Sequence, residues 1–245
     1  MKLWAHRGSH GRNGLLENTC PAFERAIQEG ADGIELDVHL SANGTPMVFH
    51  DETLTRLAIN GDRRALSQVC DDELLAVELV GGAFMPTLEA VLEQCGGRIA
   101  INIEIKDEKA VDATSGLLRR LGTPQVLLSS FSASALVHSA TVAPVIPRAW
   151  ISGDMPARDD TLAANHWPLF ELHKTRATRW HTSEYFCHPL MIGHLAMRNI
   201  STHVWTVNSP DVARRLADMG VAGIFTDAPG GMRRALSGGS STLVL

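Results

Sequence analysis

The sequence lacks an apolar run long enough to cross a membrane. A membrane-spanning helix needs about 18 consecutive apolar residues, and no stretch of the 245-residue chain reaches that length. The first eight residues also include Lys2 and Arg7, which interrupt the apolar core that a signal peptide requires. We therefore expect a cytoplasmic protein without a transmembrane segment.

Positive charge and cysteine are also scarce, and each shortage removes a class of function. The formal net charge is −5 and the isoelectric point is about 6.1, so the charge balance does not point to a nucleic-acid partner. The four cysteines lie far apart and form no CxxC pair, which predicts free, buried thiols. No predicted strand is followed by a GxGxxG or GxxxxGKS loop, which argues against a nucleotide-binding fold.

The chain does contain a regular alternation of short apolar runs and amphipathic helical patterns. Strands are predicted at residues 3–6, 33–40, 99–105, 126–131, 147–151, 169–173, 203–207 and 223–225. Helical patterns lie between most of them, at residues 18–29, 88–92, 111–121, 133–140, 190–198 and 210–219. About eight strand–helix units in a chain of this length predict a single (β/α)8 TIM barrel of the α/β class. We assign residues 1–237 to this barrel domain and expect residues 238–245 to be a flexible tail.

Two of the predicted strands carry polar side chains on one face only. In residues 99–106, isoleucines form one face, and the other face holds Asn102, Glu104 and Lys106. In residues 33–39, the polar face holds Glu35, Asp37 and His39. Two edge strands of an antiparallel sheet with one solvated face would show the same pattern. In a parallel barrel the outer face packs under helices, so these polar side chains would point inward.

Carboxylates inside a barrel need a partner. Glu35, Asp37 and Glu104 would converge near one end of the barrel and repel one another. A bound hard cation relieves that repulsion, and ligation by oxygen alone favours Mg²⁺ or Ca²⁺ over Zn²⁺. The inward-facing alternative therefore predicts a divalent metal site at these three residues.

Two histidines follow predicted strands directly. His6 ends the first strand, and His50 follows the apolar run at residues 47–49. Active sites of such barrels collect at the carboxyl ends of strands, and histidine is the usual group for proton transfer near neutral pH. Arg7 and Lys106 add positive charge at the same rim, which together with a divalent cation suits a phosphate group.

An ordered series of short motifs runs along most of the chain. The motifs are residues 6–8 (HRG), 17–19 (ENT), 22–23 (AF), 30–38 (GADGIELDV), 43–44 (NG), 48–56 (VFHDETLTR), 86–88 (PTL), 102–106 (NIEIK), 129–131 (SSF), 205–208 (WTVN) and 226–227 (TD). In this order they resemble the glycerophosphodiester phosphodiesterase family, which belongs to the wider phosphatidylinositol-phosphodiesterase-like barrel group.

The resemblance implies metal-dependent hydrolysis of glycerophosphodiesters, which are small-molecule substrates, to glycerol 3-phosphate and an alcohol. By position, His6 and His50 match the family's acid/base pair. The family's metal ligands correspond to Glu35, Asp37 and Glu104. The residues that line its phosphate site correspond to Arg7, Glu17 and Lys106. Trp205 is expected to pack beside the glycerol, with a place in the barrel core as the alternative, and we expect a monomer or a homodimer.

The sequence departs from the family pattern in three places. Leu15 and Leu16 stand where a small residue or proline is usual. The short segment between His50 and Pro86 leaves room for little or no insertion subdomain. Residues 153–189 follow no family pattern, so the headgroup of the substrate stays open.

Two other functions are compatible with the same residues. A related phosphodiesterase acting on lysophospholipids or phosphoinositides would favour an exposed apolar rim, for which the candidates are Leu15, Leu16, Trp180 and Phe186. A non-catalytic barrel that binds phosphate ligands is the other alternative, and the intact set of histidines and carboxylates argues against it.

Overall fold

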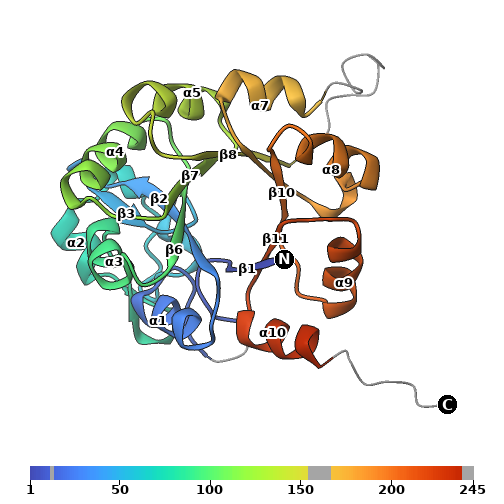
Figure 1. The fold of residues 1–245 in the computed structure, drawn as a ribbon. Helices are drawn as coiled ribbons and strands as arrows, with labels where there is room; N and C mark the ends of the chain where they lie inside the picture. Colours follow the sequence, from blue (N-terminus) through green and yellow to red (C-terminus); the bar gives the residue numbers. More distant parts are fainter. Residues whose placement is uncertain (12–13, 154–166, 239–245) are drawn as a thin grey trace.

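Eight parallel strands close into a barrel in the computed structural model, which describes residues 1–11, 14–153 and 167–238 (Figure 1). In the order in which they pair around the barrel, the strands are β1 (Lys2–Ala5), β2 (Gly33–Leu40), β6 (Ala100–Ile105), β7 (Val126–Ser130), β8 (Arg148–Ser152), β9 (Arg179–Thr182), β10 (Ser201–Val204) and β11 (Gly223–Thr226). The barrel closes because β1 pairs with both of its neighbours, through Trp4 with Gly33 on β2 and through Leu3 with Ile224 on β11. The predicted (β/α)8 fold is confirmed.

A ring of helices surrounds the strands (Figure 1). They are α1 (Cys20–Gln28), α3 (Leu88–Cys95), α4 (Ala110–Leu121), α5 (Ala133–Val142), α7 (Leu169–Thr175), α8 (Pro189–Ala196), α9 (Pro210–Asp218) and α10 (Pro229–Ser237). Proline in the first turn of α8 and α9 leaves no hydrogen bond unmade, since the first amides of a helix have no partner within it. Gly122 ends α4 in the left-handed conformation (φ 61°).

The two faces of β2 and β6 meet different surroundings, as their alternation predicts. Ile34 and Leu36 of β2 and Ile103 of β6 are buried in the layer between strands and helices. The intervening polar side chains therefore point into the barrel. This arrangement excludes the alternative of two edge strands with a solvated face.

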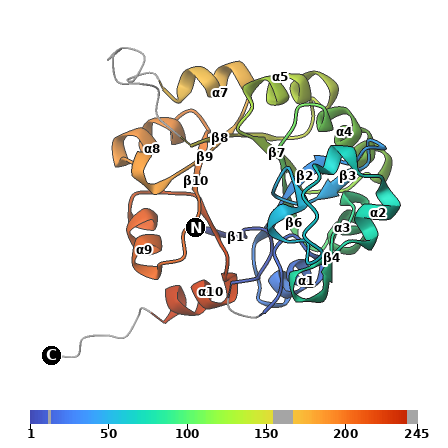
Figure 2. The ribbon, with the colours of Figure 1, turned by 180° about the vertical axis from the view of Figure 1, so that it is seen from behind.

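A small insertion follows β2. The strand β3 (Pro46–Val48) turns back and pairs antiparallel with β2, with Val48 opposite Val38. Short elements then follow, namely η1 (Leu54–Arg56), η2 (Leu66–Gln68), α2 (Asp71–Ala76), β4 (Glu78–Leu79), η3 (Val80–Gly82) and β5 (Ala83–Phe84). They share a separate apolar cluster that includes Met47, Leu66 and Leu74. Seen from the opposite side, α2 and β4 lie beside β3 and α3, at one side of the barrel (Figure 2).

The prediction between β8 and α8 is wrong in one element. Residues 169–173 were expected to form a strand, but they belong to helix α7. Leu169 and Leu172 are three residues apart, a helical spacing, and Leu172 and Thr175 form the buried side of this helix. The strand at this place in the barrel is β9, in which Trp180 faces outward to the helices and His181 faces inward. Residues 154–166 and 239–245 lie outside the described residues, and with them most of the expected tail.

No helix in the described ranges is long and apolar enough to cross a membrane. The four cysteines, Cys20, Cys70, Cys95 and Cys187, are free thiols as expected, but only Cys95 is buried and the other three are half-buried. Two of the four residues suggested for an exposed apolar rim do not belong to one. Trp180 is fully buried, and Phe186 packs edge-on against Trp167 at a centroid distance of 5.7 Å, because both belong to the cluster under α7 and α8.

Trp180 offers a test of this packing. The side chain is 0% exposed, and its indole Nε1 donates a hydrogen bond to Ser152 Oγ at 2.9 Å. We expect Trp180→Ala to lower the free energy of unfolding by about 3–5 kcal/mol, the usual loss for a buried aromatic side chain. Tyr185→Ala is the matched control, because Tyr185 is 87% exposed and should change stability by no more than about 0.5 kcal/mol. Chemical denaturation measures both, and equal effects would contradict the assigned orientation of β9.

Candidate active site

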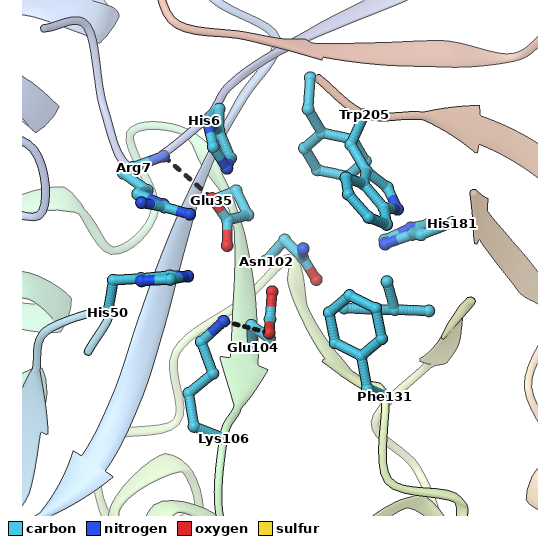
Figure 3. A pocket seen from close by; sticks show the side chains of 12 residues that line it. His6, Arg7, Glu35, His50, Asn102, Glu104, Lys106, Phe131, His181 and Trp205 are labelled. Carbon is cyan, nitrogen blue, oxygen red and sulfur yellow. Dashed lines mark hydrogen bonds and ion pairs between the residues drawn. The ribbon is translucent and has the colours of Figure 1, made fainter. Parts of the chain in front are cut away.

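One cavity at the carboxyl ends of the barrel strands collects polar side chains from most of the barrel (Figure 3). It is lined by His6, Arg7, Glu35, His50, Asn102, Glu104, Lys106, Phe131, Ile151, His181, Trp205 and Phe225. Seven of the nine predicted site residues are therefore in the lining. The other two, Glu17 and Asp37, contact the lining residues Arg7 and Lys106.

The three acidic residues come together because β2 and β6 are neighbours in register. Asp37 lies opposite Glu104, and Glu35 lies opposite Asn102. One carboxylate oxygen from each of Glu35, Asp37 and Glu104 lies within 4.8 Å of the others, and all three residues are buried. The sequence predicted this cluster, and the parallel pairing of the two strands is what forms it.

Electrostatics differ sharply within this acidic cluster. Burial raises the pKa of Glu35 well above its usual range, and the Asp37 and Glu104 carboxylates add to the effect. Burial and repulsion from Asp37 raise the pKa of Glu104 to about 7. Burial also acts to raise the pKa of Asp37, but Lys106 and Arg7 outweigh it and hold the pKa at about 2. The protein's own cations thus keep Asp37 ionised, whereas the pKa values of Glu35 and Glu104 stay raised although Lys106 also pairs with Glu104.

The cluster fits a divalent cation that prefers oxygen ligands. Its donors are carboxylate oxygens, and no sulfur or imidazole belongs to the group. Asn102, which lies opposite Glu35, offers a fourth oxygen. Its side chain is 1% exposed, and its Oδ1 has no hydrogen-bond partner among the described residues. A buried acceptor without a partner is unfavourable unless something binds it. Hard cations such as Mg²⁺ and Ca²⁺ take such all-oxygen sites.

His6 is held from the far end of the chain. Its Nδ1 lies 2.8 Å from Asp227 Oδ1, a contact that exists because β1 and β11 are neighbours in the closed barrel. Asn208 Nδ2 donates to the other oxygen of Asp227 at 2.6 Å and fixes the carboxylate. This pairing assigns the Nδ1 proton to the bond with Asp227, so that Nε2 is the nitrogen available to the cavity.

His50 is held in the same manner from its own loop. Its Nδ1 lies 2.6 Å from Asp51 Oδ1, and Asp51 in turn accepts from Arg56 Nε at 2.5 Å. Burial lowers the pKa of His50, against an opposing effect of Asp37. The imidazole is therefore neutral at neutral pH. His50 follows the apolar run at residues 47–49, as the sequence indicated. The strand in that run, β3, runs back antiparallel beside β2 and brings His50 to the level of Asp37.

Two cations flank the acidic cluster. Lys106 Nζ lies 2.9 Å from Asp37 Oδ1, and Arg7 Nε lies 3.3 Å from Asp37 Oδ2. Glu17 sits behind Arg7, since its Oε1 accepts from Arg7 Nη1 at 3.1 Å and from Arg56 Nη2 at 2.6 Å. Glu17 therefore orients a cation at the cavity wall.

The opposite wall of the cavity is aromatic. Trp205 and Phe131 pack edge to face at a centroid distance of 5.7 Å, and His181 lies on the same side (Figure 3). Burial and the nearby His203 lower the pKa of His181 well below its usual range, so its ring is neutral. The wall thus combines apolar rings with uncharged polar atoms.

Five residues of the cavity lining were not predicted as site residues, namely Asn102, Phe131, Ile151, His181 and Phe225. Asp51 and Asp227, which hold the two histidines, were not predicted either. Asn102 shares the inward face of its strand with Glu104, so the signal for it was present. His181 belongs to the strand that the apolar pattern did not reveal.

Comparison with known proteins agrees with this geometry. Residues 6–231 match the model of the glycerophosphoryl diester phosphodiesterase family. The chain belongs to this family. The Bacillus subtilis protein YqiK is 33% identical, covering 93% of this chain and 95% of its own, and the glycerophosphodiester phosphodiesterase of Bacillus altitudinis is 30% identical over the same shares. A phosphodiesterase from Oleispira antarctica, solved with its product sn-glycerol 3-phosphate, superposes with a TM-score of 0.85 at 25% identity and covers 97% of both chains.

Membership of the glycerophosphoryl diester phosphodiesterase family makes the protein an enzyme, a phosphoric diester hydrolase. The non-catalytic barrel is therefore not supported, since relatives such as the Bacillus altitudinis protein are phosphodiesterases by name.

Proposed function

We propose that the enzyme hydrolyses glycerophosphodiesters to sn-glycerol 3-phosphate and an alcohol, using a divalent metal ion and two histidines. The observation that carries the proposal is that two histidines, each with Nδ1 on a carboxylate, face one acidic cluster across a single cavity. Proton transfer and stabilisation of phosphate charge are the two requirements of phosphodiester hydrolysis.

Glu35, Asp37 and Glu104 would hold the metal ion, which is Mg²⁺ or Ca²⁺ because the donors are oxygens. When bound, the ion supplies positive charge that stabilises the phosphate oxygens as charge builds up on them. Arg7 and Lys106 contribute the remaining positive charge from the same wall of the cavity. Glu17 keeps the Arg7 guanidinium in place.

His50 and His6 divide the proton transfers between them. Burial keeps the His50 imidazole neutral, which is the form that accepts a proton from the attacking hydroxyl or water. His6 acts in its imidazolium form, in which Nδ1–H is held by Asp227 and Nε2–H faces the leaving alkoxide. It gives the Nε2 proton to the alkoxide and becomes a neutral imidazole. The attacking group is either water or the 2-hydroxyl of the substrate's own glycerol.

The aromatic wall is the place for the glycerol. Trp205 and Phe131 offer apolar rings to its carbon atoms. The buried Nε2 of His181 and Nε1 of Trp205 have no hydrogen-bond partner among the residues described, so they suit hydroxyl groups. Neutral rings are appropriate here because the glycerol carries no charge.

The decisive assay follows release of sn-glycerol 3-phosphate from glycerophosphocholine by the purified protein. EDTA should abolish the release, and added Mg²⁺ or Ca²⁺ should restore it. A parallel reaction with detergent-dispersed lysophosphatidylcholine tests the lipid alternative. Release from the lysolipid alone would overturn the proposed substrate, and release in EDTA-treated enzyme without added metal would overturn the metal requirement.

Asp227 should affect turnover because it holds the His6 ring and sets its tautomer. Asp227→Asn retains the side-chain size but presents an amide that can donate to His6 Nδ1, which favours the opposite tautomer. We expect kcat to fall by at least about 10-fold, in the direction known for such carboxylate–histidine pairs, while KM changes little. Asp211→Asn is the matched control, because Asp211 is on the exposed surface of α9 with its side chain 93% exposed. A rise in KM at unchanged kcat would contradict the positioning role of Asp227.

A further inference from the structure

The carboxylate that holds His6 also faces a second histidine. Asp227 Oδ1 lies 2.8 Å from His6 Nδ1 and 3.4 Å from His10 Nε2. The three potential ligand atoms lie within 4.8 Å of one another. His10 Nε2 is buried, its contact with Asp227 is too long or poorly aligned for a full hydrogen bond, and the proposed mechanism gives it no role.

The backbone holds these three side chains in place. The amides of His10 and Gly11 both donate to the Asp227 carbonyl, at 3.2 and 3.1 Å. Asn208 occupies Asp227 Oδ2, so Oδ1 is the oxygen left to face the two imidazoles. A groove lined by Gly11, Asn208, Pro210 and Asp227 opens beside the carboxylate. The group is therefore pre-arranged, with the groove on the Asp227 side of it.

We propose that His6, His10 and Asp227 form a second metal site, selective for Zn²⁺ or a similar nitrogen-preferring divalent ion, that inhibits the enzyme. Two imidazole nitrogens and one carboxylate oxygen are a typical zinc donor set. Neighbouring ligand atoms of a tetrahedral zinc ion lie about 3.3 Å apart for bonds of about 2.0–2.1 Å. The observed separations of 2.8 and 3.4 Å therefore need only small shifts. The all-oxygen cluster at Glu35, in contrast, favours Mg²⁺ or Ca²⁺.

Inhibition follows from the chemistry of His6, and this part of the proposal rests on the proposed function. A metal ion on Nδ1 takes the lone pair there and leaves the single ring proton on Nε2, the nitrogen that serves the cavity. That nitrogen can no longer accept a proton. If the metal-bound ring donated its Nε2 proton, it would become an imidazolate anion. This loss is far less favourable than the loss of a proton from an imidazolium, which leaves a neutral ring. Proton transfer through His6 therefore stops for every substrate headgroup.

Zinc inhibition tests the site in the working enzyme. With the supporting metal ion at saturation, Zn²⁺ is titrated against glycerophosphocholine turnover. We expect His10→Ala to raise the Zn²⁺ concentration for half-inhibition by at least about 10-fold, the effect usual for a lost metal-site residue, while turnover without zinc is kept. His10→Gln is a second variant in case alanine disturbs the loop. His138→Ala is the matched control, since His138 pairs with Asp112 at 3.0 Å on the surface of α5.

Cobalt spectroscopy provides a measurement that does not depend on turnover. Co²⁺ in a four-coordinate site with imidazole ligands gives strong visible absorption bands. We expect these bands in the wild type and in Glu35→Gln, and we expect their loss in His10→Ala. Bands that vanish in Glu35→Gln but persist in His10→Ala would overturn the site, as would unchanged zinc inhibition in both His10 variants. An enzyme inactive on glycerophosphodiesters would refute the proposed function, and the cobalt spectrum would still decide the site.

Discussion

Alanine in place of His50 lowers kcat on a glycerophosphodiester by at least about 100-fold, the usual contribution of a positioned acid or base. His50 meets the requirements of a base in this cavity. Asp51 fixes its Nδ1 at 2.6 Å, and burial keeps the ring neutral. The substitution removes the proton acceptor but leaves Glu35 and the other carboxylates in place, so metal affinity should be unchanged. Steady-state kinetics at saturating metal measure the loss.

A matched variant separates chemistry from folding. His188→Ala removes a histidine from the surface, before α8 and away from the cavity lining, and should keep full turnover. The pH profile adds a second check on the wild type. Because the pKa of His50 is lowered, kcat/KM should fall only as the pH drops below the ordinary histidine value of 6.5. Near-wild-type turnover in His50→Ala would remove this residue from the mechanism.

The sequence predicted the barrel because strand faces and helix faces leave different patterns. The isoleucines of β6 occupy every second position and pack under helices, which is a strong period-two signal. β9 escaped detection for the opposite reason. Only Trp180 of its four residues is a large apolar side chain, and its inward position is the polar His181. Residues 169–173 were read as a strand because their apolar run is too short to show its helical period.

The candidate site was predicted residue by residue, but the contacts that activate its histidines were not. Asp227 lies 221 positions from His6, and only closure of the barrel between β1 and β11 brings them together. His50 is placed by a strand that returns antiparallel along β2. The first relation joins the two ends of the chain, so local periodicity cannot reveal it. The second depends on the turn at residues 41–45, in which the Asn43-Gly44 pair is a local signal for a hairpin. The motifs identified most of the polar side chains that line the cavity, and the topology determines what holds them.

Glutamine in place of Glu35 should separate metal binding from stability, and the two effects have opposite signs. Glu35→Gln keeps an oxygen that can accept from the Arg7 amide, which now lies 2.9 Å from Glu35 Oε2, but it removes a negative charge from the metal cluster. We expect the affinity for Mg²⁺ or Ca²⁺ to fall by at least about 10-fold. Turnover should fall with it at limiting metal. Calorimetric titration and metal-dependent kinetics measure the two losses.

Stability without metal should change in the other direction. The pKa of Glu35 is raised in the folded protein, chiefly by burial. Above the pKa of the unfolded chain, the carboxyl group ionises more readily in the unfolded state than in the folded one, and this lowers the free energy of unfolding. A neutral glutamine removes that penalty, so the metal-free variant should have a higher Tm at neutral pH than the metal-free wild type. Added Mg²⁺ or Ca²⁺ should raise the Tm of the wild type more than that of the variant. Glu89→Gln, a surface change on α3 paired with Arg120, should alter neither quantity. Equal metal-induced shifts in Glu35→Gln and wild type would show that Glu35 is not a ligand.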